Sequence, residues 1–386
     1  MSYLKLIAAI SIITIGLGFN YLQMKTSLDF FGKTTATTND NDGRHRIKIA
    51  LLLDTSGSME GLLEQTKSQL WNILNELSLT QKKGQAPVLE IALYEYGNPA
   101  KGNRTNQINQ LSGFTTDMDY ISERLFSLTT NGGEEYCGQI IQTSLNELEW
   151  GSEDGDLKLI YIAGNEPFTQ GPVSYNLACI NAKEKSITVN TIYCGNHQEG
   201  IDQYWKQGAM IGGGAYMNID QDQHTVYIKT PYDDEINKLN SKLNETYVPY
   251  GNKGKEKQQS QIMQDSNASM YAECNAANRA VFKCSKQYSN AGWDLVDAYK
   301  KDKSILKKAK PVNSVFLNLT SEEMEAKIKG ISLERENIQN KIQELDKKRR
   351  LYKKEHTAEI NGNDLQNSML RSIREQAEKK GFSKKE

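Results

Sequence analysis

The stretch IALLLDTSGSMEG, residues 49–61, decides how the rest of the chain is interpreted. It begins with five apolar residues in a row, which is typical of a strand buried on both faces of a sheet. The run ends in an acid, Asp54, and two serines follow, Ser56 and Ser58, with a glycine between them. In a parallel sheet, ligands bind beyond the carboxyl ends of the strands. These three side chains therefore stand where a binding site is expected.

The chemistry of these three side chains favours a hard divalent cation. One carboxylate and two hydroxyls, without sulfur or imidazole, suit Mg²⁺, Ca²⁺ or Mn²⁺ better than zinc or copper. Gly57 lets the backbone curl between the serines. The alternative is that Asp54 or Ser56 caps the helix predicted to follow, which is a common role for these residue types. The rest of the chain has to decide between the two interpretations.

Strand-like and helix-like segments alternate from residue 46 to about residue 250. Such alternation is typical of one α/β domain with an open, mainly parallel sheet and helices on both faces. The period of the apolar residues predicts strands at 46–54, 88–97, 157–164, 187–195 and 215–230, the last with an edge hairpin. It predicts helices at 61–77, 116–128, 138–150, 173–185, 199–214 and 230–244.

The Asp-Thr-Ser-Gly-Ser turn between a buried strand and an amphipathic helix resembles the metal site of von Willebrand factor type A (VWA) domains. That family carries a D-x-S-x-S motif at its metal-ion-dependent adhesion site (MIDAS), and the resemblance covers about residues 46–250. It implies a Rossmann-like α/β domain holding a divalent cation through Ser56 and Ser58, and through Asp54 directly or by way of a water. It also implies one coordination position open to a carboxylate of a partner protein.

The chain departs from the family in the glycine-flanked loop that usually supplies a threonine ligand. The loop reads LTTNGGEEYCG at 128–138, and Glu134 stands where the threonine is expected, with Glu135 next. A carboxylate is also a good ligand for a hard cation, so Glu134 is predicted to take that role. The alternative is that Thr129 or Thr130 reaches the site through a remodelled loop.

A second departure concerns the aspartate that usually ends the fourth strand of the family in a TDGEP-like turn. This chain reads IAGNEPF there, so Gly164 or Asn165 takes its place. Asn165 offers a carbonyl oxygen without a charge. The predicted ligands of the cation, Mg²⁺ with Mn²⁺ or Ca²⁺ as alternatives, are Asp54, Ser56, Ser58, Glu134 and Asn165. The alternative is a domain that has kept the fold and lost the ion.

A catalytic interpretation would rest on Cys137 and His197. Cys137 is expected to begin a helix, where the helix dipole lowers the pKa of a thiol, and His197 follows a strand that ends at the same edge. The sequence contains no Walker A, GxGxxG or GxSxG motif, and its four histidines form no cluster. We therefore predict a protein that is not an enzyme, and keep a Cys-His hydrolase as the last alternative.

The N-terminus predicts export from the cytoplasm. Within residues 1–25 an early cation, Lys5, precedes an apolar run from Leu6 to Phe19, which suits a signal peptide or an N-terminal membrane anchor. A buried N-terminal helix is the further alternative. A polar linker is predicted at 26–45. We expect a protein of the periplasm or cell envelope, bound to the membrane if the segment is not cleaved. Stretches such as YEYGN and GNEPFTQGP also resemble exported bacterial VWA proteins.

Beyond residue 250 the chain is polar and helical. Helices are predicted over 255–315, and 320–356 shows a heptad spacing that is typical of a short coiled coil. Two of its four a positions are arginines, Arg335 and Arg349, so the alternative is a solvated helix that folds back on the domain. Residues 357–386 are predicted to be disordered.

These observations predict a binding protein. A net charge of −1 gives no reason to expect a nucleic-acid partner. We expect an adhesion-type VWA domain that binds the carboxylate of a protein partner through its cation, with homo-oligomerisation through the C-terminal helix. The alternative is a metal-free structural scaffold assembled through the C-terminal helices.

Overall fold

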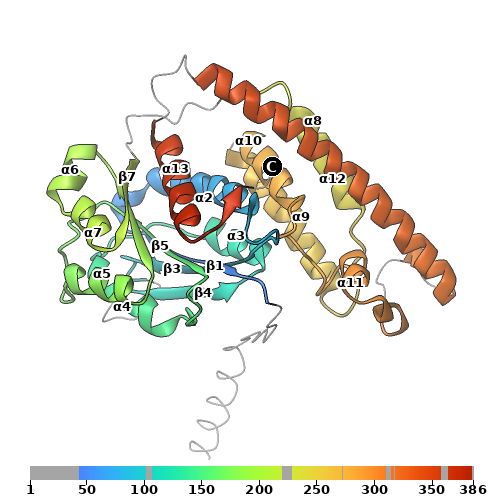
Figure 1. Ribbon diagram of the computed structural model, residues 1–386, viewed down its shortest axis with the longest axis horizontal. Coiled ribbons are helices and arrows are strands. Elements are labelled where there is room, and N and C mark those ends of the chain that lie inside the picture. Colours follow the sequence, from blue (N-terminus) through green and yellow to red (C-terminus); the bar gives the residue numbers. More distant parts are fainter. Residues whose placement is uncertain are drawn as a thin grey trace, which may run out of the picture. The chain divides into compact units, whose positions relative to one another are not determined.

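The computed structural model describes residues 43–100, 107–219, 228–271, 273–309, 314–316, 318–357 and 364–384. Its centre is a six-stranded sheet in the order β4-β3-β1-β5-β6-β7 (Figure 1). The strands are β1 (Arg46–Asp54), β3 (Val88–Tyr96), β4 (Asn109–Thr115), β5 (Leu157–Gly164), β6 (Thr188–Cys194) and β7 (Gly213–Ile219). All neighbours are parallel except β3 and β4. The predicted α/β fold with a mainly parallel sheet is confirmed.

The apolar run of β1 is explained by its place in the middle of the sheet. Successive side chains of a strand point to opposite faces. Ile49 and Leu51 accordingly belong to one core, whereas Ala50 and Leu52 belong to the other. A strand with helices on both sides has no face for polar residues.

Helices cover both faces of the sheet (Figure 1). Those of the α/β part are α2 (Leu62–Ser78), α3 (Met118–Phe126), α4 (Cys137–Glu147), α5 (Tyr175–Glu184), α6 (His197–Asp202), α7 (Trp205–Ile211) and α8 (Asp233–Glu245). Apolar residues of α4, α5 and α7 share a core with Ala50 and Leu52. Those of α2, α3 and α8 share the opposite core with Ile49 and Leu51. The edge hairpin predicted after β7 falls mainly on residues 220–227, which lie outside the described residues.

Five helices follow residue 250 in the described part of the chain. They are α9 (Gly254–Tyr271), α10 (Glu273–Lys283), α11 (Leu295–Lys301), α12 (Ser321–Thr357) and α13 (Asp364–Lys379), with short 3₁₀ turns at Lys303–Lys307 and Ser314–Phe316. Apolar residues of α10, α12 and α13 belong to the core that contains Leu51 of β1. Helices from both sides of residue 250 thus share one core.

The heptad seam of α12 faces the chain itself. Arg335 is 1% exposed in its side chain and forms ion pairs with Asp294 and Asp297. Arg349, two heptads later, is 4% exposed in its side chain and forms an ion pair with Asp233 of α8. The two arginines at a positions therefore meet buried acids of the same chain. This is the fold-back arrangement, in which the a positions of the seam are buried against the chain itself.

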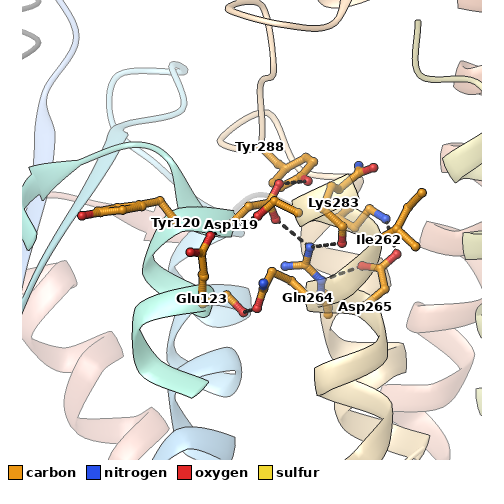
Figure 2. Close-up of polar contacts among 12 residues, drawn as sticks. Asp119, Tyr120, Glu123, Ile262, Gln264, Asp265, Lys283 and Tyr288 are labelled. Carbon is orange, nitrogen blue, oxygen red and sulfur yellow. Dashed lines mark hydrogen bonds and ion pairs between the residues drawn. The ribbon is translucent and has the colours of Figure 1, made fainter. Parts of the chain in front are cut away.

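A buried network of charges joins α3 to α9 and α10 (Figure 2). The guanidinium of Arg279 lies 2.6 Å from an oxygen of Asp119 in α3 and 2.6 Å from an oxygen of Asp265 in α9. The ammonium of Lys283 lies 2.8 Å from the other oxygen of Asp265. The hydroxyl of Tyr288 donates to Asp119 at 2.7 Å. Two buried acids are thus matched by two buried cations.

The prediction of a disordered tail at 357–386 is wrong for the part that the structure describes. Residues 364–379 form α13, and β8 (Ser383–Lys384) pairs antiparallel with β2 (Thr80–Gln81). Ile373 and Phe382 are buried in the core, and Gln376 exchanges hydrogen bonds with Asn190 of β6. The segment is polar on average, but its few apolar residues recur on one face, and that periodicity decides the packing.

Residues 1–42 lie outside the described residues, and the signal-peptide or anchor prediction falls on them, as does most of the predicted linker. In the remainder that the structure describes, no helix is both long enough and apolar enough to cross a membrane. Export and the predicted domain boundaries stay predictions.

Candidate metal centre

Three strand ends meet at the edge of the sheet where the D-x-S-x-S turn begins. Asp54, the last residue of β1, pairs in register with Tyr96, the last residue of β3. On the other side of β1, Leu53 pairs with Ala163, so β5 ends at the same level. The turns that follow the three strands therefore converge. The D-x-S-x-S turn thus lies at the carboxyl ends of the strands, where ligands bind in parallel sheets.

Four of the five predicted ligand residues form one connected cluster. Asp54 accepts a hydrogen bond from the Ser56 backbone N–H at 2.7 Å. The hydroxyls of Ser56 and Ser58 lie 2.9 Å apart, and Ser58 donates to the side-chain oxygen of Asn165 at 3.0 Å. Helix α2 begins after Gly61 without a side-chain cap. The serine and aspartate side chains therefore face one another and do not cap α2.

Asp54 is the buried floor of this cluster. Its side chain is 0% exposed, and its Oδ2 atom forms no hydrogen bond of good geometry with any described residue. Burial raises the pKa of Asp54 from 3.8 to about 7, against the opposing hydrogen bonds of Ser56 and of the Asn165 backbone. A buried carboxylate oxygen without a hydrogen bond of good geometry is costly, so this atom is where a bound cation would compensate most.

Two glycines make room for the carboxylate. A Cβ atom on Gly97, whose φ is +76°, would stand 2.7 Å from Oδ1 of Asp54 and 3.0 Å from Cγ of Glu135. A Cβ on Gly164 would stand 3.1 Å from Oδ2 of Asp54 and 2.5 Å from the Tyr96 hydroxyl. Gly164 thus keeps the space around Asp54 open, while Asn165 supplies the side-chain oxygen.

The glycine-flanked loop runs beside the D-x-S-x-S turn, as predicted, but it presents a different acid. The Asn131 N–H donates to the Thr55 carbonyl at 2.9 Å, which fixes the loop alongside the turn. Glu134 is exposed, and its carboxylate accepts a hydrogen bond from the Tyr136 hydroxyl. Glu135 is only 4% exposed and interacts with Ser56 and Asp54. The structure therefore places Glu135, and not Glu134, beside the cluster.

The register of the loop explains this difference. A Cβ on Gly133 would stand 2.1 Å from the carbonyl oxygen of Gly97, so only glycine fits at that point. Beyond it the N–H of Glu134 donates to Gln107, whereas the N–H of Glu135 donates to Gln170. The two neighbouring glutamates are thus held by different partners. No feature of the sequence distinguished one glutamate from the next.

The charged groups that act on one another at the cluster are acids. Burial, followed by the charge of Asp54, raises the pKa of Glu135 from 4.5 to about 8. Glu166 adds a further negative charge that acts on both groups. No group of three or more His, Cys, Asp and Glu side chains that could hold a metal ion occurs in the described part of the chain. A cation here would depend on the hydroxyl and amide oxygens as well, and such an all-oxygen set suits a hard cation.

Cys137 and His197 belong to separate pairs. The Cys137 thiol is fully buried at the start of α4 and lies 3.8 Å from the Tyr96 hydroxyl. Burial raises the pKa of this thiol well above its ordinary value, so it is not a thiolate at neutral pH. His197 is exposed, and its ring nitrogen lies 3.0 Å from the Asn218 side chain. This geometry offers no Cys-His nucleophile.

A mainly parallel sheet with helices on both faces, and a D-x-S-x-S turn at the end of a central strand, are what the family resemblance implies. The fold is that of a VWA domain. This assignment rests on the strand order and on the position of the turn.

Comparisons with known proteins find likeness in fold. No family model matches the sequence, and no curated protein matches it. The VWA domain of SpRpn10 is 16% identical over 46% of this chain and 89% of that chain, with a TM-score of 0.36. The conserved hypothetical protein BatB from Bacteroides thetaiotaomicron is 16% identical over 45% of this chain and 90% of that chain, with a TM-score of 0.34.

A third solved structure is proximal thread matrix protein 1 from the mussel byssus with a zinc occupied MIDAS motif. It is 12% identical over 47% of this chain, with a TM-score of 0.35. The match spans 43% of that protein's length. At these identities and scores, the three likenesses add nothing about metal use or partners to what the VWA fold and the site geometry support.

Proposed function

We propose that this protein is a non-catalytic binding module, exported to the cell envelope, whose VWA domain uses a divalent cation to hold a carboxylate of a protein partner. The observation that carries the proposal is the buried Oδ2 atom of Asp54, which lacks a hydrogen bond of good geometry among the described residues. It lies in a cluster of oxygen donors at the edge of the sheet. A bound cation would remove the cost of burying this negative charge.

The residues that would hold the cation are those of the cluster. Asp54 lies at its base, the hydroxyls of Ser56 and Ser58 follow, and Asn165 contributes an amide oxygen. These hard donors favour Mg²⁺ or Mn²⁺, with Ca²⁺ as the alternative. The bound cation supplies the positive charge that a partner carboxylate needs. Ser58 is exposed and Asn165 partly so, which makes this side the accessible one.

The scaffold alternative has less support. It requires assembly of several chains through the C-terminal helices, and the natural surface for that is the heptad seam of α12. The seam residues Arg335, Ile342 and Arg349 are buried within the chain. A metal-free scaffold would also leave the acids of the cluster without compensation.

A capture experiment tests the proposal. The full-length protein is immobilised and exposed to an envelope extract with Mg²⁺ or with EDTA. We expect partner proteins to be retained only with Mg²⁺, to be released by EDTA and by high acetate, and to be lost in Asp54→Ala. Asp154→Ala is the matched control, because Asp154 is exposed and precedes β5 at the opposite edge of the sheet. Equal retention with EDTA and by Asp54→Ala would overturn the proposal.

A further inference from the structure

We infer that Glu135 is a built-in carboxylate ligand of the cation, which strengthens cation binding and competes with the carboxylate of a partner. The inference rests on the proposed function, because it presupposes that a cation binds beside Asp54. It goes further by naming the residue that sets how strongly the loaded site attracts an acidic partner.

The position of Glu135 is the first argument. A single point, the place of a Cβ on Gly97, lies within 3.4 Å of Oδ1 of Asp54, Cγ of Glu135 and Cβ of Ser56. The three side chains therefore converge. Asp54 itself is fully buried: its Oδ1 atom accepts the hydrogen bond of the Ser56 N–H, and its Oδ2 atom has no hydrogen bond of good geometry among the described residues. Two carboxylates this close carry like charges and repel one another.

The rigidity of the loop is the second argument. The N–H of Glu135 donates to the Gln170 side chain at 3.0 Å, and the N–H of Glu134 donates to Gln107 at 2.9 Å. Gly133 is packed against the Gly97 carbonyl, so the loop cannot shift by a residue without a clash. The orientation of Glu135 toward the cluster is thus held by backbone contacts and does not depend on a partner.

The charge balance of the site determines how strongly the bound cation attracts a carboxylate of a partner. Asp54 and Glu135 together carry two negative charges and neutralise a divalent cation. A carboxylate from a partner meets little net positive charge, and it must enter beside Glu135 or replace it. A threonine ligand, which the family resemblance implies at the position of Glu134, together with an uncharged residue at 135 would leave one positive charge for the partner. Glu135 therefore shifts the site toward tight cation binding and weak carboxylate binding.

Mn²⁺ and acetate serve as probes in a test with the full-length protein. Calorimetric titration gives the Mn²⁺ affinity, and water-proton relaxation measures the exchangeable waters on bound Mn²⁺ and their displacement by acetate. Glu135→Gln keeps the shape and removes the charge, and Glu134→Gln is the matched control one residue away. Thermal unfolding without metal verifies that each variant folds.

For Glu135→Gln we expect an Mn²⁺ affinity lower by about tenfold or more, a higher relaxation rate per bound Mn²⁺, and tighter acetate binding. Glu134→Gln should match the wild type in all three. Equal Mn²⁺ and acetate affinities for the wild type and Glu135→Gln would overturn the inference and leave the proposed function standing. Absence of Mn²⁺ binding in the wild type would overturn both.

Discussion

The protein contains two groups of largely buried acids whose neighbours carry different charges. Asp119 and Asp265, between α3 and the C-terminal helices, meet Arg279 and Lys283 (Figure 2). The acids at the edge of the sheet, with Asp54 at their centre, meet hydroxyls, an amide and further acids. Burial is similar in the two places, so burial is not what separates them.

The pKa values of the two groups express the difference. Burial alone would raise the pKa of Asp265, but the charges of Lys283 and Arg279 outweigh it and hold this pKa well below its ordinary value. The pKa of Asp54 rises from 3.8 to about 7, because burial is opposed only by hydrogen bonds. The acids of the first group are paired with cations of the chain. Under the proposed function, a bound divalent cation takes that role in the second group.

The largest expected change in stability comes from removing the charge of Arg279 from its network with Asp119 and Asp265. Arg279→Met leaves Asp119 and Asp265 buried with one countercharge fewer, and should lower the free energy of unfolding by about 3–5 kcal/mol. Urea unfolding measures this loss. Lys238→Met, which removes an exposed ion pair with Glu235, should cost no more than about 1 kcal/mol. A comparable small loss for both variants would remove the distinction between the two groups.

The next largest effect is a gain in stability, expected for Asp54→Asn. Without metal at pH 8, Asp54→Asn should raise the free energy of unfolding by roughly 2–4 kcal/mol, because it removes a buried charge whose cost follows from the raised pKa. Chemical unfolding in EDTA measures it. A loss of stability in this variant would show that Asp54 is compensated in the metal-free protein.

The pH dependence of the two groups should have opposite signs. An acid with a raised folded pKa binds its proton more tightly when folded, so the stability that Asp54 contributes is full below pH 3.8 and is lost as the pH rises through about 7. The contribution of Asp265 is present above its unfolded pKa and is lost as the pH falls through its lowered folded value. In EDTA, Asp54→Asn should reduce the decline between about pH 4 and 7 and leave the acid limb intact, and the decline that remains up to about pH 8 belongs to Glu135. An undiminished decline in Asp54→Asn would contradict the assignment to Asp54.

A further effect separates the two neighbouring glutamates. Glu135 has a pKa raised to about 8, so Glu135→Gln should also raise metal-free stability at pH 9. Glu134 is exposed, and Glu134→Gln should leave stability unchanged. Thermal unfolding of the two variants at pH 6 and pH 9 measures the difference. Identical curves would place the two glutamates in equivalent environments.

The smallest effect concerns the C-terminal helix. Arg374 of α13 forms an ion pair with Glu76 of α2, but its side chain is 46% exposed. Arg374→Ala should therefore lower the free energy of unfolding by at most about 1 kcal/mol. Limited proteolysis and urea unfolding measure it together. Release of α13 in this variant would mean that the ion pair, and not the apolar contacts of Ile373 and Phe382, holds the helix.

Much of the fold was predictable because β1 and its neighbours are apolar on both faces. Such runs of Val, Ile and Leu have few alternatives to a covered parallel sheet. The polar edge strand β4 was missed because NQLSGFT carries no clear alternation. The packing of α12 was left open, since arginines at a positions suit either solvent or buried acids. Only the structure shows that Asp294 pairs with Arg335 and Asp233 with Arg349.

The candidate site was predictable in the rigid D-x-S-x-S turn. It was not predictable in the glycine-flanked loop, where two neighbouring glutamates were equally suitable. Asp54, Ser56 and Ser58 are fixed by the strand end and the tight turn, and Asn165 follows from the parallel strand beside it. The choice between Glu134 and Glu135 depends on contacts with Gln107 and Gln170, which lie far away in the sequence. Local sequence patterns do not contain such contacts.

The most direct test of the central claim compares thermal unfolding of the wild type and Asp54→Asn at pH 8, each with EDTA and with Mg²⁺. The account predicts that in EDTA the wild type melts below Asp54→Asn. With Mg²⁺ at 100 times its Kd, the wild type should gain about 2.7 kcal/mol, and the variant should gain nothing. If Mg²⁺, Mn²⁺ and Ca²⁺ all leave the wild-type curve unchanged, the acids at the edge of the sheet are not a cation site.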